Sequence, residues 1–285
     1  MEKRKIFVIG HKNPDTDSVC SAIAYAQLKN EIDTENEYIP LRAGQTNEET
    51  QYVLKQFGVN APQYVMDVKS QVKDIEIRKV DGVDRNISIK AAWKLMRDIG
   101  VVTLPITRDN KLEGLITIAD IATSYMDVHD STTLSTARTV CKNIVETLDG
   151  ALIIGDEEHV FDRGKVLVAA ANPDLMESYI RMGDIVILGN RYESQLCAIE
   201  MQAGCIVVCE GAPVSMTIKK LAVENHCTII STPHDTFTAS RLINQSVPIS
   251  FFMRTEGLIT FSTEAYTDEV RQVMAKKRHR DFPIP

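Results

Sequence analysis

Five short apolar segments, separated by stretches with helical periodicity, constrain the middle of this chain most strongly. They are ALIIGD (151–156), KVLVAAAN (165–172), DIVILGN (184–190), GCIVVCEG (204–211) and CTIISTP (227–233). Each is long enough for one buried strand. Alternation of strands and helices predicts a parallel sheet that is covered by helices, and therefore an α/β fold.

The N-terminal segment KIFVIGHKNPDTDS opens a second region of the same kind. Lys5 to Ile9 predict a fully buried parallel strand, and the residues from Ser18 onward predict a helix. The polar residues between them therefore lie at the carboxyl end of a strand, the edge at which open α/β sheets hold their ligands.

His11, Asp15 and Asp17 form a dense group of candidate metal ligands in this connection. Two carboxylates this close repel each other unless a cation lies beside them. The imidazole nitrogen favours Mn, Co, Fe or Zn over Ca. Three ligands leave coordination positions open for water or phosphate oxygens.

The same residues also fit a solvated turn, with Asn13, Pro14 and Asp15 as turn residues and Asp17 as the helix N-cap. Spacing alone leaves both interpretations open.

HKNPDTDS, followed by RAGQTNEETQYVLKQFG (42–58), resembles the start of the manganese-dependent, family II inorganic pyrophosphatases of the DHH phosphoesterase superfamily. The resemblance implies Mn²⁺, or Co²⁺ or Mg²⁺, with His11 and Asp15 on one metal and Asp17 on the second. It also implies that two metals activate a bridging water, which attacks pyrophosphate.

The family completes its site with a further Asp, a DHH tripeptide, another downstream Asp and a C-terminal domain that brings Lys and Arg to the substrate. None of these can be placed in the 285 residues, so no catalytic set is complete here. We expect this chain to be the N-terminal part of a longer protein and to be inactive alone.

The segment WKLMRDIGVVTLPITRDNKLEGLITIADI (93–121) resembles a CBS domain. The resemblance implies that Thr117 binds a phosphate and Asp120 the ribose of an adenine nucleotide, with Ile87, Val101 and Pro105 beside the base. The alternative is that Thr117 or Asp120 only caps a helix.

The C-terminal segment repeats this pattern. Met274 precedes Pro283 as Met96 precedes Pro105, and Phe282-Pro283-Ile284 mirrors Leu104-Pro105-Ile106. The Thr and Asp of a second copy would follow Pro285, so we expect the chain to stop inside this repeat. The region between the copies resembles a DRTGG domain, although that pentapeptide is not present verbatim.

The predicted domains are the N-terminal part of a DHH domain (1–63), a first CBS domain (64–130), a DRTGG-like domain (131–248) and an incomplete second CBS domain (249–285). This order resembles the nucleotide-regulated pyrophosphatases, in which AMP or ADP inhibits and ATP or diadenosine polyphosphates activate. It implies pyrophosphate as the substrate and a homodimer. The alternatives are a nucleotide-sensing module without catalysis and another DHH phosphoesterase.

Composition narrows the possible partners. A net charge of −7 and one short basic stretch, KKRHRD (276–281), predict no nucleic-acid binding, and no apolar run predicts a membrane span. We expect a cytoplasmic protein. The six cysteines form no CxxC pair and lie mostly in apolar segments, as buried thiols do.

Overall fold

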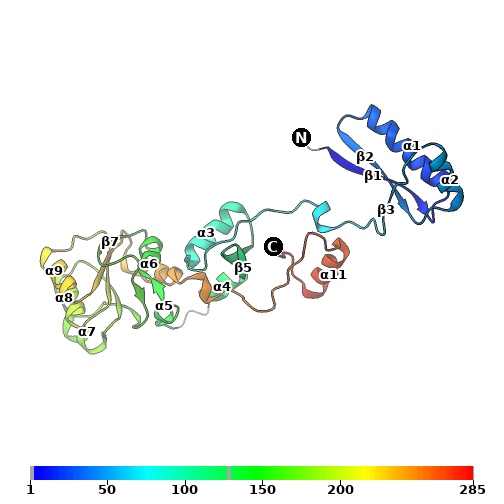
Figure 1. Ribbon diagram of the computed structural model, residues 1–285. Coiled ribbons are helices and arrows are strands. Elements are labelled where there is room, and N and C mark those ends of the chain that lie inside the picture. Colours follow the sequence, from blue (N-terminus) through cyan, green and yellow to red (C-terminus); the bar gives the residue numbers. More distant parts are fainter. Residues whose placement is uncertain (1–2, 127–129, 285) are drawn as a thin grey trace. The chain divides into compact units, whose positions relative to one another are not determined.

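The computed structural model describes residues 3–126 and 130–284, and their contacts divide the chain into two units (Figure 1). One unit contains the residues up to Glu76 together with Thr263–Lys276. The other contains Ile77–Ser262 and the residues from Lys277. The boundaries of the four predicted domains remain predictions.

The first unit is built on a parallel three-stranded sheet with the strand order β1-β2-β3. Its elements are β1 (Arg4–Lys12), α1 (Thr16–Ile32), β2 (Asn36–Ala43), α2 (Glu48–Gln56) and β3 (Gln63–Tyr64). The predicted strand is parallel, but it is not fully buried. Phe7 is 59% exposed, whereas its neighbours Ile6 and Val8 are half-buried. This alternation is typical of an edge strand covered on one face.

Two segments distant in sequence pair within this unit. The 3-10 helix η1 (Val72–Asp74) lies against the residues before α11 (Thr267–Lys277). The Val72 amide donates to the Ala265 carbonyl at 2.9 Å, and Lys73 Nζ lies 2.7 Å from Glu264 Oε2. Val72 is 2% exposed, so this pairing has a small apolar centre.

The second unit contains a five-stranded sheet with the order β7-β12-β11-β10-β9. Its strands are β7 (Ala151–Ile154), β9 (Val166–Val168), β10 (Ile185–Leu188), β11 (Cys205–Val208) and β12 (Thr228–Ser231). All five predicted strands are present, and β9 to β12 are parallel. However, β7 is antiparallel to β12. The residues between β7 and β9 form the short strand β8 (Val160–Phe161) in place of the crossover helix that a parallel connection requires.

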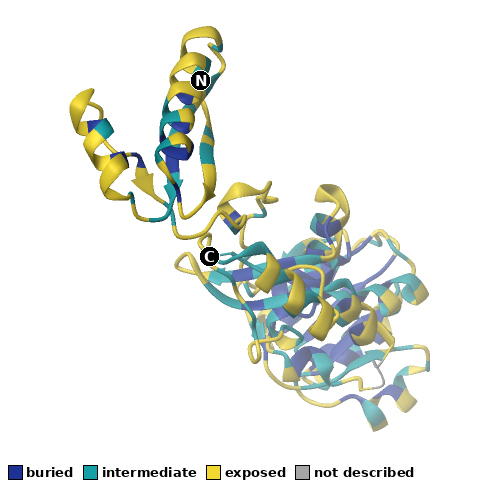
Figure 2. Cartoon of the chain, turned by 90° about the vertical axis from the view of Figure 1, so that its right-hand side faces the viewer, coloured by how far each residue is buried: buried dark blue, intermediate teal, exposed yellow. Residues whose placement is uncertain are grey.

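The two faces of this sheet contact two apolar clusters. Ile185, Ile187 and Val207 contribute to one cluster, and Val186 and Ile206 to the other, as the two-residue period of a strand requires. The helices α7 (Pro173–Tyr179), α8 (Tyr192–Glu200) and α9 (Met216–Glu224) supply the second cluster, and α6 (Cys141–Thr147) and α10 (Thr236–Leu242) supply the first. Figure 2 shows the buried residues concentrated in this unit.

The first cluster continues into the CBS-like region. This region consists of α3 (Ile89–Ile99), β4 (Thr103–Arg108), β5 (Lys111–Thr117) and α4 (Ile118–Met126). Leu104, Ile106 and Ile116 belong to the same cluster as Ile185, so one continuous core supports both regions. The other short elements of the second unit are α5 (Thr133–Thr136), β6 (Thr139–Val140), η2 (Ile243–Ser246) and η3 (Ile249–Phe251).

The predicted second copy is only partly similar to the first. The helices α3 and α11 both have 11 residues, with Met96 and Met274 at matching positions. Met96 is completely buried, whereas α11 has no buried residue. Phe282 to Ile284 do not form a strand, in contrast to the β4 segment that they mirror. The first copy's strand is stabilised by its ladder of hydrogen bonds with β5. The mirrored segment of the second copy instead accepts a backbone hydrogen bond from the Phe261 amide at the Pro283 carbonyl, at 3.3 Å.

Five of the six cysteines are buried, as predicted. Burial raises the pKa of Cys141 and Cys227 to about 12, and it also raises the pKa of Cys205 well above its usual value. Cys205 and Cys209 both contribute to the first apolar cluster, which confirms that they face a core.

Among the described residues, no helix is long and apolar enough to cross a membrane.

Candidate functional site

The candidate metal loop lies where the carboxyl ends of β1 and β2 meet. Asn13, in the loop after β1, has a φ of 57°, which asparagine tolerates, and its amide donates to the Ala43 carbonyl at 3.4 Å. A side chain at Gly44 would place its Cβ 2.6 Å from Pro14 Cδ. Glycine at this position therefore lets the second loop approach the first.

His11, near the end of β1, and Asp15, in the loop that follows, lie close together. His11 Nε2 is 3.3 Å from Asp15 Oδ1, and both side chains are about 60% exposed, at 59% and 60%. Asp15 Oδ1 also accepts a hydrogen bond from the Ser18 amide at 2.9 Å, which makes Asp15 the N-cap of α1. This bond, together with the nearby His11, holds the pKa of Asp15 below its usual value. In the turn interpretation, the cap was expected at Asp17, and the structure places it two residues earlier.

Asp17 lies in the first turn of α1, where its Oδ1 accepts a hydrogen bond from Ser21 Oγ at 3.3 Å. Within residues 3–126 and 130–284, no three His, Cys, Asp or Glu side chains lie close enough together to hold a metal ion. The structure thus brings His11 and Asp15 together and leaves Asp17 beside them. Their roles as metal ligands remain predictions.

The donor set nevertheless fits a divalent transition metal. An imidazole and two carboxylates are suitable ligands for Mn²⁺ or Co²⁺, and the exposure of His11 and Asp15 leaves them accessible. The adjacent Ser18 Oγ is buried and has no hydrogen-bond partner among the residues that the structure describes. This hydroxyl is therefore available for a hydrogen bond to a water or to another group bound beside the loop.

Thr117 and Asp120 form a reciprocal cap at the start of α4. The Thr117 amide donates to Asp120 Oδ2 at 2.9 Å, and the Asp120 amide donates to Thr117 Oγ1 at 3.2 Å. Thr117 Oγ1 also donates to Asp120 Oδ2 at 2.6 Å. The capping alternative is therefore realised in the structure. Capping does not exclude ligand binding, so the nucleotide roles of both residues remain predictions.

Arg254 completes this arrangement, and the sequence interpretation missed it. Its Nε and Nη2 atoms donate to Asp120 Oδ1 at 2.9 and 2.7 Å. The two residues are 134 positions apart. No local pattern links an arginine to a carboxylate at that separation, so the sequence contains no signal for this pair.

The three predicted base-contacting residues occupy separate places in the same unit. Val101 is 9% exposed and follows α3, Pro105 lies opposite Leu115 in the β4–β5 hairpin, and Ile87 accepts a hydrogen bond from the Ile249 amide at 2.9 Å. Ile87 and Pro105 are half-buried. Their contact with a nucleotide base remains a prediction.

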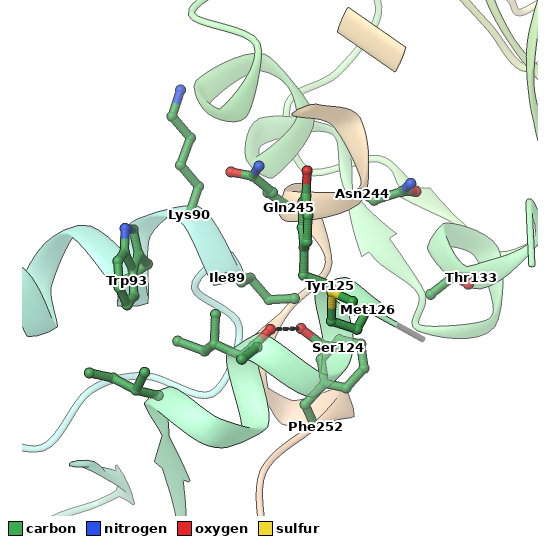
Figure 3. Close-up of a pocket in the computed structure, with 13 residues that line it drawn as sticks. Ile89, Lys90, Trp93, Ser124, Tyr125, Met126, Thr133, Asn244, Gln245 and Phe252 are labelled. Atoms are coloured by element: carbon green, nitrogen blue, oxygen red, sulfur yellow. Dashed lines mark hydrogen bonds between the residues drawn. The ribbon is translucent and has the colours of Figure 1, made fainter. Parts of the chain in front are cut away.

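An apolar pocket of about 340 Å³ lies nearby in this unit, and its lining includes none of the five predicted nucleotide residues. Figure 3 shows Trp93 and Lys90 on α3, Tyr125 and Met126 on α4, and Gln245 around it. Ile118 and Ile121, next to the Thr117–Asp120 cap, contribute to the wall. The pocket thus borders the cap but does not include its polar groups.

Comparison with known families identifies two domains. The N-terminal domain model of the DHH family matches residues 5–155, and the DRTGG domain model matches residues 143–246. The first match covers the loop with His11, Asp15 and Asp17.

Two curated relatives are similar over nearly the whole chain. The cobalt-dependent inorganic pyrophosphatase of Clostridium perfringens is 40% identical over 284 residues, which cover 99% of this chain and 51% of that protein. The probable manganese-dependent inorganic pyrophosphatase of Thermotoga maritima is 30% identical over 276 residues, which cover 97% and 50%. The chain therefore spans about half the length of these relatives.

One solved structure is similar to most of the chain. It is the crystal structure of the CBS and DRTGG domains of the regulatory region of Clostridium perfringens pyrophosphatase, complexed with its activator, diadenosine tetraphosphate. The identity is 37% and the TM-score is 0.71, and the match covers 76% of this chain and 94% of that one.

Proposed function

The chain belongs to the DHH family, and we propose that it carries part of the metal site and the nucleotide sensor of a metal-dependent inorganic pyrophosphatase with CBS and DRTGG regulatory regions. The proposed reaction is the hydrolysis of pyrophosphate to two phosphates. The observation that carries this proposal is the His11–Asp15 pair at the carboxyl end of a parallel strand, in a loop that matches the DHH family.

His11, Asp15 and Asp17 would hold the metal, which we propose to be Mn²⁺ or Co²⁺, with Mg²⁺ as a further candidate. When bound, such an ion lowers the pKa of a bound water and polarises a phosphoryl oxygen. The hydrogen bond from the Ser18 amide holds the pKa of Asp15 below its usual value and fixes the orientation of a carboxylate that is ionised near neutral pH. The second carboxylate, on Asp17, lies one residue beyond the start of α1.

The CBS-like region would bind the regulatory nucleotide, with Asp120 on the ribose and Thr117 on a phosphate. AMP, ADP, ATP and diadenosine polyphosphates are the proposed ligands. The similar solved structure with diadenosine tetraphosphate supports this class of ligand.

A homodimer and a cytoplasmic location are further proposals. Trp93 and Tyr125, 42% and 47% exposed at the apolar pocket, support an interface between copies.

Calorimetric titration with Mn²⁺ tests the metal site in this chain. The double variant Asp15→Asn, Asp17→Asn should bind Mn²⁺ about 100-fold more weakly, because even changes outside the direct ligands typically cost about 10–100-fold. Asparagine remains a good N-cap, so α1 should be retained. In the cobalt-dependent inorganic pyrophosphatase of Clostridium perfringens, the matching double variant should lose phosphate release from pyrophosphate.

Glu31→Gln provides the matched control, because Glu31 is an exposed carboxylate on α1 at the opposite end from the loop. This control should bind Mn²⁺ as the wild type does. Equal Mn²⁺ affinity in the double variant and the wild type would show that the loop is only a turn.

A further inference from the structure

The carboxylate of Asp120 has no free acceptor position in this structure. Its Oδ2 accepts from the Thr117 amide and from Thr117 Oγ1, and its Oδ1 accepts from Arg254 Nε and Nη2. An ionised carboxylate offers about four lone-pair sites. Four donors already use them, so a ribose that binds Asp120 must first displace one of these partners.

Arg254 is the partner that can be displaced. The Thr117 donors belong to the cap of α4 and are held by the backbone of that turn. The Arg254 side chain is 53% exposed, so its guanidinium can be solvated after it leaves. The Asp120 side chain is only 13% exposed and depends on replacement hydrogen bonds.

The backbone of Arg254 is fixed beside β5, which keeps a displaced guanidinium near the site. The Arg254 amide donates to the Leu115 carbonyl at 2.9 Å, and the Leu115 amide donates to the Arg254 carbonyl at 3.0 Å. Gly114 makes this approach possible, because a Cβ there would lie 2.9 Å from the Arg254 carbonyl oxygen and 3.1 Å from Met253 Sδ. Side-chain rotation can therefore move the charge while its Cα stays in place.

We propose that Arg254 makes the nucleotide site selective for phosphorylated nucleosides. The ribose hydroxyls replace the guanidinium on Asp120 Oδ1, and the released guanidinium pairs with a phosphate of the same ligand. Arginine forms paired hydrogen bonds with phosphate as readily as with carboxylate. A nucleoside without phosphate breaks the same Asp120–Arg254 contact and offers the guanidinium no new partner. This inference rests on the proposed nucleotide-sensing function.

Equilibrium titration of this chain with AMP and with adenosine tests the exchange. In the wild type, AMP should bind at least about tenfold more tightly than adenosine, the gain typical of a charge-assisted contact. In Arg254→Ala, adenosine should bind more tightly than in the wild type, because no Asp120–Arg254 contact has to break. The affinity for AMP should change little, because AMP is relieved of the same cost and loses an equivalent contact between its phosphate and the guanidinium. The ratio of the two affinities should fall clearly below the wild-type value, to the smaller advantage that the proposed contact of Thr117 with the phosphate gives.

Two further variants separate the exchange from a general effect. Arg254→Lys keeps the charge but loses the planar fork, so its affinity ratio should lie between those of the wild type and Arg254→Ala. If Arg254→Ala fails to fold, Arg254→Lys alone still tests whether the affinity ratio depends on Arg254. Arg97→Ala removes an exposed cation of α3 and should leave the ratio unchanged.

The outcomes of these titrations separate the proposed role of Arg254 from nucleotide sensing itself. If both Arg254 variants keep the wild-type ratio, Arg254 is only a structural partner of Asp120 and the inference is wrong, while nucleotide sensing stands. If the wild-type chain binds neither AMP nor adenosine, the proposed sensing function and this inference both fail.

Discussion

Asp149 illustrates how single side chains connect distant parts of the second unit. Asp149 Oδ1 accepts a hydrogen bond from Lys90 Nζ at 3.0 Å, and Asp149 Oδ2 lies 3.1 Å from His234 Nε2. Lys90 Nζ also donates to the Thr147 carbonyl at 2.8 Å. The Lys90 hydrogen bond, with a smaller contribution from His234, holds the pKa of Asp149 below its usual value. Asp149 therefore stabilises the fold in its ionised form.

Because the folded-state pKa is lowered, this stabilisation is present above the unfolded pKa of about 3.9 and is lost as the pH falls through the folded value. Asp149→Asn should reduce the free energy of unfolding at pH 7 by under about 1 kcal/mol, since the side chain is 57% exposed and solvent screens the pair. The φ of 48° at this position suits asparagine.

Urea unfolding at pH 7 and at pH 3 measures this effect. The difference between the wild type and Asp149→Asn should shrink at pH 3, whereas the exposed control Asp98→Asn should show little difference at either pH. A deficit of the variant that stays equal at both pH values would contradict an ionisation effect.

At the level of elements, the two central strands β10 and β11 are completely buried on both faces. Ile206 on β11 is 0% exposed and packs in the cluster with Ile218 and Ala222 of α9. Val168, at the end of the edge strand β9, is 40% exposed. The stability of the sheet should therefore depend on its centre far more than on its edge.

Ile206→Ala should lower the free energy of unfolding by about 2–5 kcal/mol, because it removes buried methyl groups and leaves a cavity. Val168→Ala, the edge control, should cost under about 1 kcal/mol, as exposed substitutions do. Urea denaturation followed by circular dichroism measures both. Similar costs at the two positions would show that β11 is not the centre of the core.

For the whole molecule, the division into two units separates the candidate metal loop from the candidate nucleotide residues. His11 and Asp15 belong to the first unit, and Thr117, Asp120 and Arg254 to the second. Ligands that bind only the folded form stabilise it through the unit that they contact. The two proposed ligands should therefore protect different segments.

Hydrogen exchange followed by mass spectrometry checks this separation. Mn²⁺ should slow exchange in residues 10–19, and AMP should slow exchange in residues 114–121 and 252–255. Asp120→Asn should remove the protection by AMP and keep the protection by Mn²⁺. If AMP protects these segments equally in Asp120→Asn, the nucleotide does not bind through Asp120.

Local sequence patterns were sufficient for the α/β class, for β1 and α1, and for the strands of the five-stranded sheet. The five apolar segments became β7, β9, β10, β11 and β12. Helix caps, turns and two-residue periods depend on residues within about four positions of one another. The metal loop was recognisable for the same reason, since its residues are neighbours in sequence.

Tertiary structure decided how distant segments meet. It made β7 antiparallel, left Phe7 exposed on an edge strand, and placed the Arg254 guanidinium on Asp120 across 134 residues. Such pairings depend on the packing free energy of the whole unit, to which no local periodicity corresponds. The sequence alone therefore determined which residue types could bind a metal or a nucleotide, and only the folded chain determined which of them already have partners.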